Sequence, residues 1–433
     1  MDKIFYVIAG GTFVEVAPHF SFAAPAFGKV GRELAPFLVG ALARLGRPNT
    51  RVQLVLTRMA IGGAERSPEE LAWFERIGIK DLRTNADMQL LVDHLVADPA
   101  TKGIVLAAAL TDLQPSRLLI DGVPSSEVGR ERSRLNSSKA LTIETEPAPK
   151  IVAGIRRERK DLFLVGFKTT SGMEADVQYL RGLALLKGAS CNLVLANDLK
   201  THLNMVITPE QARYHETTNR REALAGLAEM IALRSELTFT RATVVPGDAI
   251  KWGSELIAPS LREVVNHCIA RGAYKPFNGV TVGHFASRGP DGTILTSRRK
   301  TNFNRLDETG LVLIEPHGED EVIAHGFKPS VGGQSQRIIF DAHPELDCIV
   351  HMHSPLRAGS VVPVREQRPY ECGSHECGRN TNDGLASFDG IHAVMLDKHG
   401  PNIVFPKAMD PKKVIAFIEA NIDLAARTDN LAT

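Results

Sequence analysis

Short apolar runs alternate with amphipathic stretches through the first half of the chain. Runs of continuous apolar residues, such as Ile4–Ala9 and Leu162–Phe167, are typical of strands that are buried on both faces of a sheet. Between such runs, residues 29–45 and 86–97 have the apolar spacing of helices. Buried strands interleaved with helices predict an α/β unit built on a doubly wound, mainly parallel sheet.

The pattern changes after about residue 237. Residues 219–235 predict a helix that closes the first unit, and Thr238–Pro259, with its Pro-Gly and Trp-Gly pairs, predicts a connector. A new helix begins near Ser260, followed by short strands and Gly-rich turns. We therefore expect one domain over residues 1–237, a linker over 238–258 and a second domain over 259–433. The polar, Ser- and Arg-rich residues 116–140 predict a long flap or hairpin in the first domain.

Bulk composition excludes several classes of protein. A net charge of +1 over 433 residues gives no support to nucleic-acid binding. Five cysteines fit a reducing compartment better than a disulfide framework. The sequence contains neither a secretion signal nor an apolar run of membrane-spanning length. We expect a cytoplasmic protein that acts on a small-molecule substrate, with neither nucleic acid nor membrane as a partner.

A histidine pattern in the second domain predicts a metal site. His351 and His353 are two residues apart at the end of an apolar run, so on a strand both would lie on one face. A second apolar run, Ala393–Leu396, leads shortly to His399-Gly400. Two strands that each deliver histidine at their ends could bind one divalent ion through His351, His353 and His399. A chance His-x-His pair on a surface strand is the alternative.

The motifs around these histidines resemble the class II aldolase/adducin family. The resemblance is carried, in the family's order, by Gly283–Arg288, Asp291–Ser297, Leu311–Glu315, Pro329-Ser330, Ala342–Ser354 and Met395–Gly400. It implies an α/β/α domain with a mostly antiparallel sheet, a homo-oligomer (dimer or tetramer), and lyase chemistry in which a metal polarises a carbonyl. Zinc is the expected metal, with manganese and iron as alternatives. The resemblance also implies a substrate site at Ser330, His284 and Ser297.

Two positions depart from that family, and the first is His284, which stands where the family has an asparagine in its substrate loop. The glutamate that follows its Pro-Ser-Ser segment falls here at Gly332, which can neither ligate a metal nor move a proton. The segment PYECGSHECG offers substitutes, and we expect catalytic residues among Tyr370, Glu371 and Glu376, with His375 as a further candidate. Its Cys372, His375 and Cys377 could alternatively form a second metal cluster, although their spacing is not that of a zinc knuckle.

The first domain resembles the phosphopantothenate–cysteine ligase family. Ala9–Thr12, Gly28–Gly31, Leu106–Asp112, Val165–Phe167 and Leu193–Asp198 resemble its motifs in order. The resemblance implies a Rossmann-like fold that binds CTP or ATP at the carboxyl ends of its strands. The expected nucleotide-binding residues are Gly10, Gly11, Thr12, Ala108, Asp112, Phe167 and Asn197. The family's key asparagine falls at Ala24, and its flap lysines are replaced by Arg130, Arg132 and Arg134, with Lys139 beyond them.

Three functional hypotheses remain open from the sequence. Both domains could act in one pathway, the first activating a carboxylate or binding a nucleotide and the second performing lyase, isomerase or dehydratase chemistry. The first domain could instead be a scaffold or nucleotide sensor beside an aldolase-type enzyme. The chain could also be a non-catalytic binding or assembly protein, as adducins are.

Overall fold

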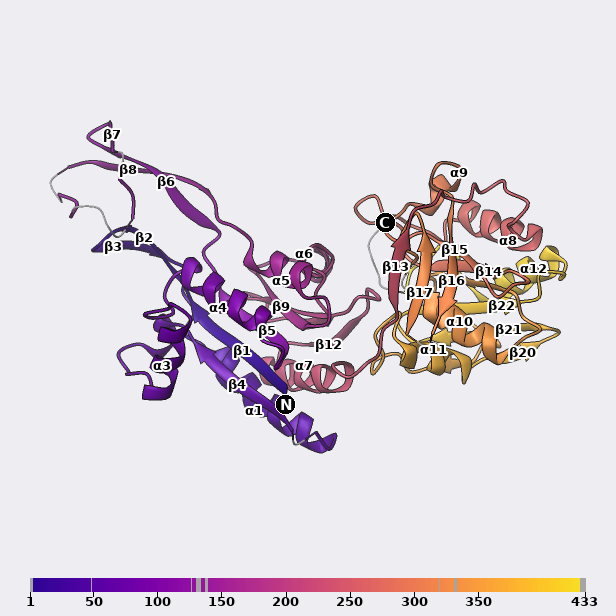
Figure 1. Cartoon of the computed structure of the whole chain (residues 1–433), viewed down its shortest axis with the longest axis horizontal. Helices are drawn as coiled ribbons and strands as arrows, with labels where there is room; N and C mark the ends of the chain where they lie inside the picture. The colour runs from indigo at the N-terminus through magenta and orange to yellow at the C-terminus, as the bar shows by residue number, and fades with distance from the viewer. Residues whose placement is uncertain are drawn as a thin grey trace. The chain divides into compact units, whose positions relative to one another are not determined.

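The computed structural model describes residues 3–47, 49–125, 127–129, 134–136, 139–318, 320–330 and 333–428. Their contacts divide the chain into two compact units. The first comprises Met1–Thr208 and His215–Ser235, and the second comprises Pro209–Tyr214 and Glu236–Thr433. Figure 1 labels most of the elements of each unit. Within the described ranges, no helix has the length and apolar character needed to cross a lipid bilayer.

The first unit is built on a seven-stranded sheet of order β12-β11-β10-β9-β5-β1-β4. Its strands are β1 (Lys3–Gly11), β4 (Thr50–Leu56), β5 (Thr101–Ala109), β9 (Phe163–Thr170), β10 (Leu193–Asp198), β11 (Asn204–Ile207) and β12 (Arg213–Thr217). The five strands from β4 to β10 are parallel, and β11 pairs with β10 in antiparallel fashion. The predicted mainly parallel sheet is therefore present.

Helices cover both faces of this sheet, as a doubly wound arrangement requires. The helices are α1 (Lys29–Arg44), α2 (Arg58–Ile61), α3 (Pro68–Arg76), α4 (Asn85–Ala97), α5 (Ile151–Glu158), α6 (Ala175–Ala189) and α7 (Arg220–Arg234). Gly31 of α1 lies against Val7 and Ala9, whereas α6 packs on the other face, where its Gly182 lies against Val194. Helix α7 packs against α1, and α4 and α5 lie on the side of α6.

Two small sheets complete the first unit. They are the hairpin of β2 (Phe13–Ala17) and β3 (Phe20–Ala23), and a three-stranded sheet of order β7-β6-β8. The latter contains β6 (Leu113–Ile120), β7 (Val123–Ser125) and β8 (Leu141–Pro147). The polar stretch over residues 116–140 thus forms a hairpin where the structure describes it, and β6 and β7 pair in antiparallel fashion within it.

The second unit is built on a ten-stranded sheet of order β13-β17-β16-β15-β14-β18-β22-β21-β19, with β20 also paired to β21. Its strands are β13 (Arg241–Val245), β14 (His284–Arg288), β15 (Ile294–Ser297), β16 (Leu311–His317), β17 (Glu321–His325), β18 (Cys348–His351), β19 (Val364–Arg365), β20 (Ala386–Phe388), β21 (Ile391–Leu396) and β22 (Gly400–Phe405). Only the pairs β13–β17 and β19–β21 are parallel among the pairs the structure describes. The sheet is therefore mostly antiparallel, as expected.

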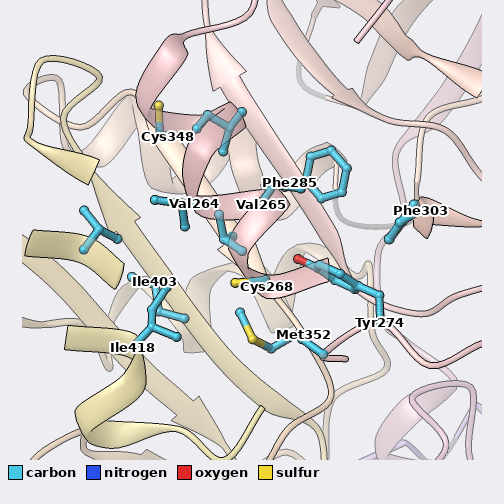
Figure 2. Close-up of a cluster of buried hydrophobic side chains, with 14 of the residues drawn as sticks. Val264, Val265, Cys268, Tyr274, Phe285, Phe303, Cys348, Met352, Ile403 and Ile418 are labelled. Atoms are coloured by element: carbon cyan, nitrogen blue, oxygen red, sulfur yellow. The ribbon is translucent and has the colours of Figure 1, made fainter. Parts of the chain in front are cut away.

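Helices lie on both faces of this second sheet. They are α8 (Pro259–Ala270), α9 (Leu306–Thr309), α10 (Gly333–Ala342), α11 (His375–Asn382) and α12 (Pro411–Asn421), with a 3-10 turn over Phe303–Arg305. One core joins α8 and α12 to the sheet, and Figure 2 shows its members Val264, Cys268, Ile403 and Ile418. The other core joins α10 to the strand residues that point to the opposite face of the sheet, such as Ile349 of β18 and Val404 of β22.

The segment predicted as a linker, residues 238–258, is part of the second unit. Its residues 241–245 form β13, which pairs with β17 along its whole length. Ile250 forms a further bridge with Leu311. The sequence Arg-Ala-Thr-Val-Val contains β-branched residues typical of an edge strand, and the Pro-Gly pair that follows marks the end of that strand rather than a free connector.

Candidate metal site

Three histidines form a buried cluster in the second unit. His351, His353 and His399 are 1, 4 and 2% exposed, and each offers a ring nitrogen that lies within 4.8 Å of the other two. The Nε2 atoms of His351 and His399 are 3.2 Å apart. The rings of His353 and His399 meet edge to face, with centroids 4.8 Å apart. The structure therefore brings together the three residues that the sequence predicted as metal ligands.

The backbone around these residues explains the convergence. His351 ends β18, and β18 pairs with β22, which begins at Gly400 directly after His399. The turn before Gly400 requires a positive φ of 55° at Lys398. A Cβ on Gly400 would lie 1.9 Å from the carbonyl oxygen of Met352. Only glycine therefore allows the start of β22 to approach the His351–His353 segment so closely.

The cluster fits a divalent ion. Metal–nitrogen bonds of about 2.0–2.1 Å place neighbouring ligand nitrogens roughly 2.9 Å apart in an octahedron and 3.4 Å apart in a tetrahedron. The observed 3.2 Å between His351 and His399 lies between these values. His351 Nδ1 donates to the carbonyl oxygen of Pro401 at 2.9 Å, which leaves Nε2 as the nitrogen that can ligate. Burial lowers the pKa of His351 to about 4, against the opposing effect of the Pro401 hydrogen bond, so the ring is neutral near pH 7.

A fourth histidine lies beside the cluster. His284 of β14 pairs directly with His351 of β18, so both side chains lie on one face of the sheet, with ring centroids 4.9 Å apart. Its Nδ1 is 2.8 Å from Nε2 of Gln336, which reaches down from α10. Burial lowers the pKa of His284 well below its usual value, and the neighbouring His351 lowers it further. His284 is therefore a neutral imidazole held in place by an amide.

Three of these four histidines line a common cavity. Besides His284, His351 and His399, it is lined by Ser335, Cys372, Gly373, Cys377, Thr381, Leu396 and Asn402. The sequence had indicated neither Ser335 nor Asn402 as site residues. Asn402 pairs with His351 across β18 and β22, and Ser335 lies on the first turn of α10, so both reach the cavity through strand register and helix packing. No local motif marks either position.

The predicted substrate residues fall into two places. Ser297, the last residue of β15, and Ser330 lie together, with their hydroxyl oxygens 3.1 Å apart. The backbone N–H of Ser330 also donates to the carbonyl oxygen of Ser297 at 2.9 Å. His284 lines the metal cavity itself. Gly332, which stands where the class II aldolase/adducin family has its glutamate, lies outside the described residues.

The predicted catalytic residues are placed differently from one another. Tyr370 and the buried Glu371 directly precede Cys372 and Gly373, which line the cavity. Glu376 instead accepts hydrogen bonds from the backbone N–H and the hydroxyl of Thr238 at 3.0 and 2.8 Å. Those bonds connect α11 to the segment before β13, so Glu376 has a structural role.

His375 also lies away from the three-histidine cluster. Its Nε2 is 2.8 Å from the Thr240 hydroxyl, and its Nδ1 is 3.6 Å from the Asp320 carboxylate. Among the described residues, His375 and the two cysteines do not come close enough together to form the alternative metal cluster. Two other groups of side chains there could hold a metal ion. Cys372 and Cys377 belong instead to the wall of the cavity.

In the first unit, the predicted Gly-Gly-Thr turn has a packing role. A Cβ on Gly10 would lie 2.1 Å from the Thr57 hydroxyl, and one on Gly11 would lie 1.9 Å from the carbonyl oxygen of Ala24. The N–H groups of Gly11 and Thr12 donate to backbone carbonyls within the unit. The Thr12 hydroxyl bonds Asn85 and accepts from the backbone N–H of Thr111. The backbone amides of Gly11 and Thr12, two of the expected nucleotide-binding residues, are therefore used inside the fold.

The other predicted nucleotide residues lie along the carboxyl edge of the same sheet. Ala108 pairs with Gly10 in register, and Phe167 and Asn197 lie on the adjacent strands β9 and β10. Asn197 accepts a hydrogen bond from the Thr169 hydroxyl at 3.3 Å. Asp112 is exposed and forms an ion pair with Lys150.

Of the flap cations, Lys139 pairs with Asp121 at 3.4 Å and Arg134 is exposed. Arg130 and Arg132 lie outside the described residues. Ala24, the position of the family's asparagine, donates its N–H to the carbonyl oxygen of Thr12.

Comparison with known proteins confirms both resemblances. Residues 263–358 match the family model described as "Class II Aldolase and Adducin N-terminal domain". A curated relative, the coenzyme A biosynthesis bifunctional protein CoaBC of Thermococcus kodakarensis, is 29% identical over 97 residues. That match spans 22% of this chain and about a fifth, 21%, of the relative. The chain thus combines a region similar to the ligase family with one similar to the class II aldolase family.

Solved structures resemble the two regions at low identity. The DNA/pantothenate metabolism flavoprotein of Streptococcus pneumoniae is 19% identical, with a TM-score of 0.40, over 52% of this chain and 96% of that one. An L-fuculose 1-phosphate aldolase is 14% identical, with a TM-score of 0.28, over 39% of this chain and 85% of that one. At these values the matches bear on neither the ligand nor the reaction of this chain.

Proposed function

We propose that the chain is a two-domain, metal-dependent enzyme whose second unit carries out lyase chemistry or a related isomerase or dehydratase reaction. A small hydroxy-carbonyl or phosphorylated compound would be the substrate. The observation that carries the proposal is the buried cluster of His351, His353 and His399, with two Nε2 atoms 3.2 Å apart. Buried imidazoles that share a cavity with polar groups are a costly arrangement unless they bind something.

The chain's own residues support the proposed chemistry in several ways. His351, His353 and His399 would hold a divalent ion, with zinc favoured over manganese or iron, and such an ion supplies Lewis acidity toward a carbonyl oxygen. The Pro401 carbonyl fixes the orientation of the His351 ring. Gln336 holds His284 in the cavity as a neutral group that can hydrogen-bond a substrate oxygen. The paired hydroxyls of Ser297 and Ser330 would bind a polar or phosphorylated end of the substrate.

The proton transfer is assigned to the loop before α11. Gly332 provides no carboxylate at the position that the family uses. We assign general acid–base chemistry to Glu371 or Tyr370, because Glu371 directly precedes Cys372 of the cavity wall and Tyr370 is the next residue back along the chain. Glu376 is a weaker candidate, since Thr238 binds both of its carboxylate oxygens.

We further propose that the first unit binds CTP, ATP or a related anion at the carboxyl edge of its sheet. Open parallel sheets bind ligands at this edge. Ala108, Phe167, Asn197 and the exposed Asp112 lie there on neighbouring strands or just beyond them. The Gly10–Thr12 segment then shapes the floor of that site, because its amides are used within the fold. A homo-oligomer, either a dimer or a tetramer, and a cytoplasmic location complete the proposal.

A non-catalytic binding or assembly role is the second candidate. The loss of a carboxylate at Gly332 and of the ligase asparagine at Ala24 favours it. The retained three-histidine cluster favours the enzyme, because a binding protein has no need of three converging buried imidazoles.

Metal content and nucleotide response separate these readings. Purified wild type should bind a divalent ion that His351→Ala does not bind at this site, while circular dichroism shows that the variant remains folded. Turnover of a trial substrate that survives in His351→Ala would rule out the proposed metal role. A thermal-shift series with CTP and ATP tests the first unit, and the absence of any shift with either would remove the nucleotide proposal while leaving the metal proposal intact.

A further inference from the structure

A second group of metal-binding side chains lies on the second unit, outside the cavity described above. It consists of His343, Glu345 and His392, whose ligand atoms all lie within 4.8 Å of one another. His343 and Glu345 follow α10, whereas His392 lies on β21, so residues nearly 50 positions apart in the chain meet here. None of the three was indicated by the histidine motifs of the sequence.

The backbone fixes this group from both sides. The N–H of His343 donates to the Ile339 carbonyl at 3.0 Å, and the His343 carbonyl accepts from the N–H of Leu346 at 3.0 Å. Leu346 is 1% exposed and belongs to the core under α10, so the turn that carries Glu345 is anchored at its end. That turn places the Glu345 Oε1 atom 3.6 Å from His343 Nδ1.

His392 approaches from the sheet. It pairs with Ser387 of β20 and Val404 of β22, which hold its backbone on both sides. Its ring meets that of His343 edge to face, with centroids 5.3 Å apart and an interplanar angle of 79°. The side chains of His343 and Glu345 are 26 and 59% exposed, so an ion could enter from solvent without opening the fold.

We propose that His343, Glu345 and His392 form a second divalent-metal site. Two imidazoles and one carboxylate suit zinc, cobalt, nickel or copper, whereas magnesium and calcium prefer oxygen ligands. The three residues leave the remaining positions of the ion to water or to a solvent-borne ligand.

This site is separate from the three-histidine cluster. On β22, Asn402 pairs with His351 of β18, and Val404 pairs with His392 of β21. The two histidines therefore lie on the same face of the sheet, two strands apart and offset by two residues along the strands. Sheet spacings place their Cα atoms roughly 12 Å apart, whereas ions of a two-metal catalytic centre are about 3.5–4 Å apart. The second ion would therefore join the end of α10 to β21 and take no direct part in chemistry at the cavity. Because α10 also delivers Gln336 to His284, the second ion would steady the helix that walls the first site.

Zinc titration of the metal-free full chain tests the proposal. Isothermal calorimetry and metal analysis after gel filtration should find two zinc ions per chain in wild type and one in His392→Ala. Glu345→Gln, which keeps the size of an exposed side chain, should weaken the second ion at least tenfold and leave the first unchanged. His317→Ala, which removes an exposed histidine elsewhere on the sheet, is the matched control and should retain both ions.

The outcomes also separate this site from the proposed catalytic one. His351→Ala should lose one ion and retain the one that depends on His392. If His392→Ala and Glu345→Gln bind as many ions as wild type with equal affinity, the second site does not exist, whatever His351→Ala does. If His351→Ala changes nothing while His392→Ala loses an ion, the second site stands and the proposed catalytic site fails.

Discussion

Gly400→Ala is the substitution from which the geometry of the three-histidine cluster makes its sharpest prediction. The new Cβ would lie 1.9 Å from the Met352 carbonyl oxygen and 3.2 Å from Cε1 of His351. A carbon–oxygen contact needs about 3.3 Å. The start of β22 and the His351–His353 segment must therefore separate by roughly 1.4 Å, several times the approximately 0.2 Å tolerance of a metal–ligand distance.

We expect Gly400→Ala to bind zinc about 10–100-fold more weakly at this cluster, comparable to the loss of an outer-shell contact. The metal-free protein should lose about 2 kcal/mol of unfolding free energy through overpacking. Chelator-competition titration measures the first effect and denaturant unfolding the second. Gly253→Ala is the control, because its Cβ would meet nothing within 4 Å. Wild-type zinc affinity in a folded Gly400→Ala variant would refute the claim that the Gly400–Met352 approach sets the site.

Three further predictions concern ion pairs and buried acceptors. Arg66, whose side chain is 2% exposed, binds two carboxylates and a backbone carbonyl. Arg66→Met should therefore lower the free energy of unfolding of the first unit by about 2–3 kcal/mol, measured in urea. An unchanged free energy of unfolding would show that those bonds add no net stability. Partial burial raises the pKa of Glu419, but hydrogen bonds from Arg271 and His267 outweigh burial and lower that pKa below its usual value. The stability that Glu419 adds is thus present above its unfolded pKa and lost as the pH falls through the folded one. Glu419→Gln should cost about 0.5–1 kcal/mol at pH 7 and nothing near pH 2, and a constant difference across that range would contradict this. Asp198 accepts hydrogen bonds from four backbone N–H groups and one hydroxyl, so Asp198→Asn should lower the melting temperature of the first unit. Asp93→Asn, on the exposed surface of α4, should lower it less.

The sequence predicted the three clustered histidines as candidate ligands partly because their pattern is local. His351 and His353 share a strand end, and the His399-Gly400 pair follows a second apolar run, so periodicity and spacing indicate them. The resemblance of the flanking motifs to the class II aldolase/adducin family then favoured a ligand set over a chance His-x-His pair. Such reasoning does not predict the neighbours of these histidines. The Pro401 carbonyl contacts His351, Asn402 pairs with His351, and Gln336 contacts the adjacent His284. These neighbours are placed by the register of β18 with β22 and by the packing of α10.

Local pattern does not reveal where a motif has a packing role. Gly10, Gly11 and Thr12 were expected among the nucleotide-binding residues, and close contacts with Thr57 and Ala24 show that both glycines also serve packing. The expected linker contains Pro-Gly and Trp-Gly pairs, but the β-branched residues before them form the edge strand β13. In both cases the deciding contact comes from a distant part of the chain, and that contact has no signature in the local sequence.

Anomalous diffraction at the zinc edge, from crystals of the full chain grown with zinc, tests the central claim most directly. The account predicts a peak about 2.0–2.1 Å from a ring nitrogen of each of His351, His353 and His399, and the loss of that peak in His351→Ala. Full zinc loading with no peak among these three residues would contradict it.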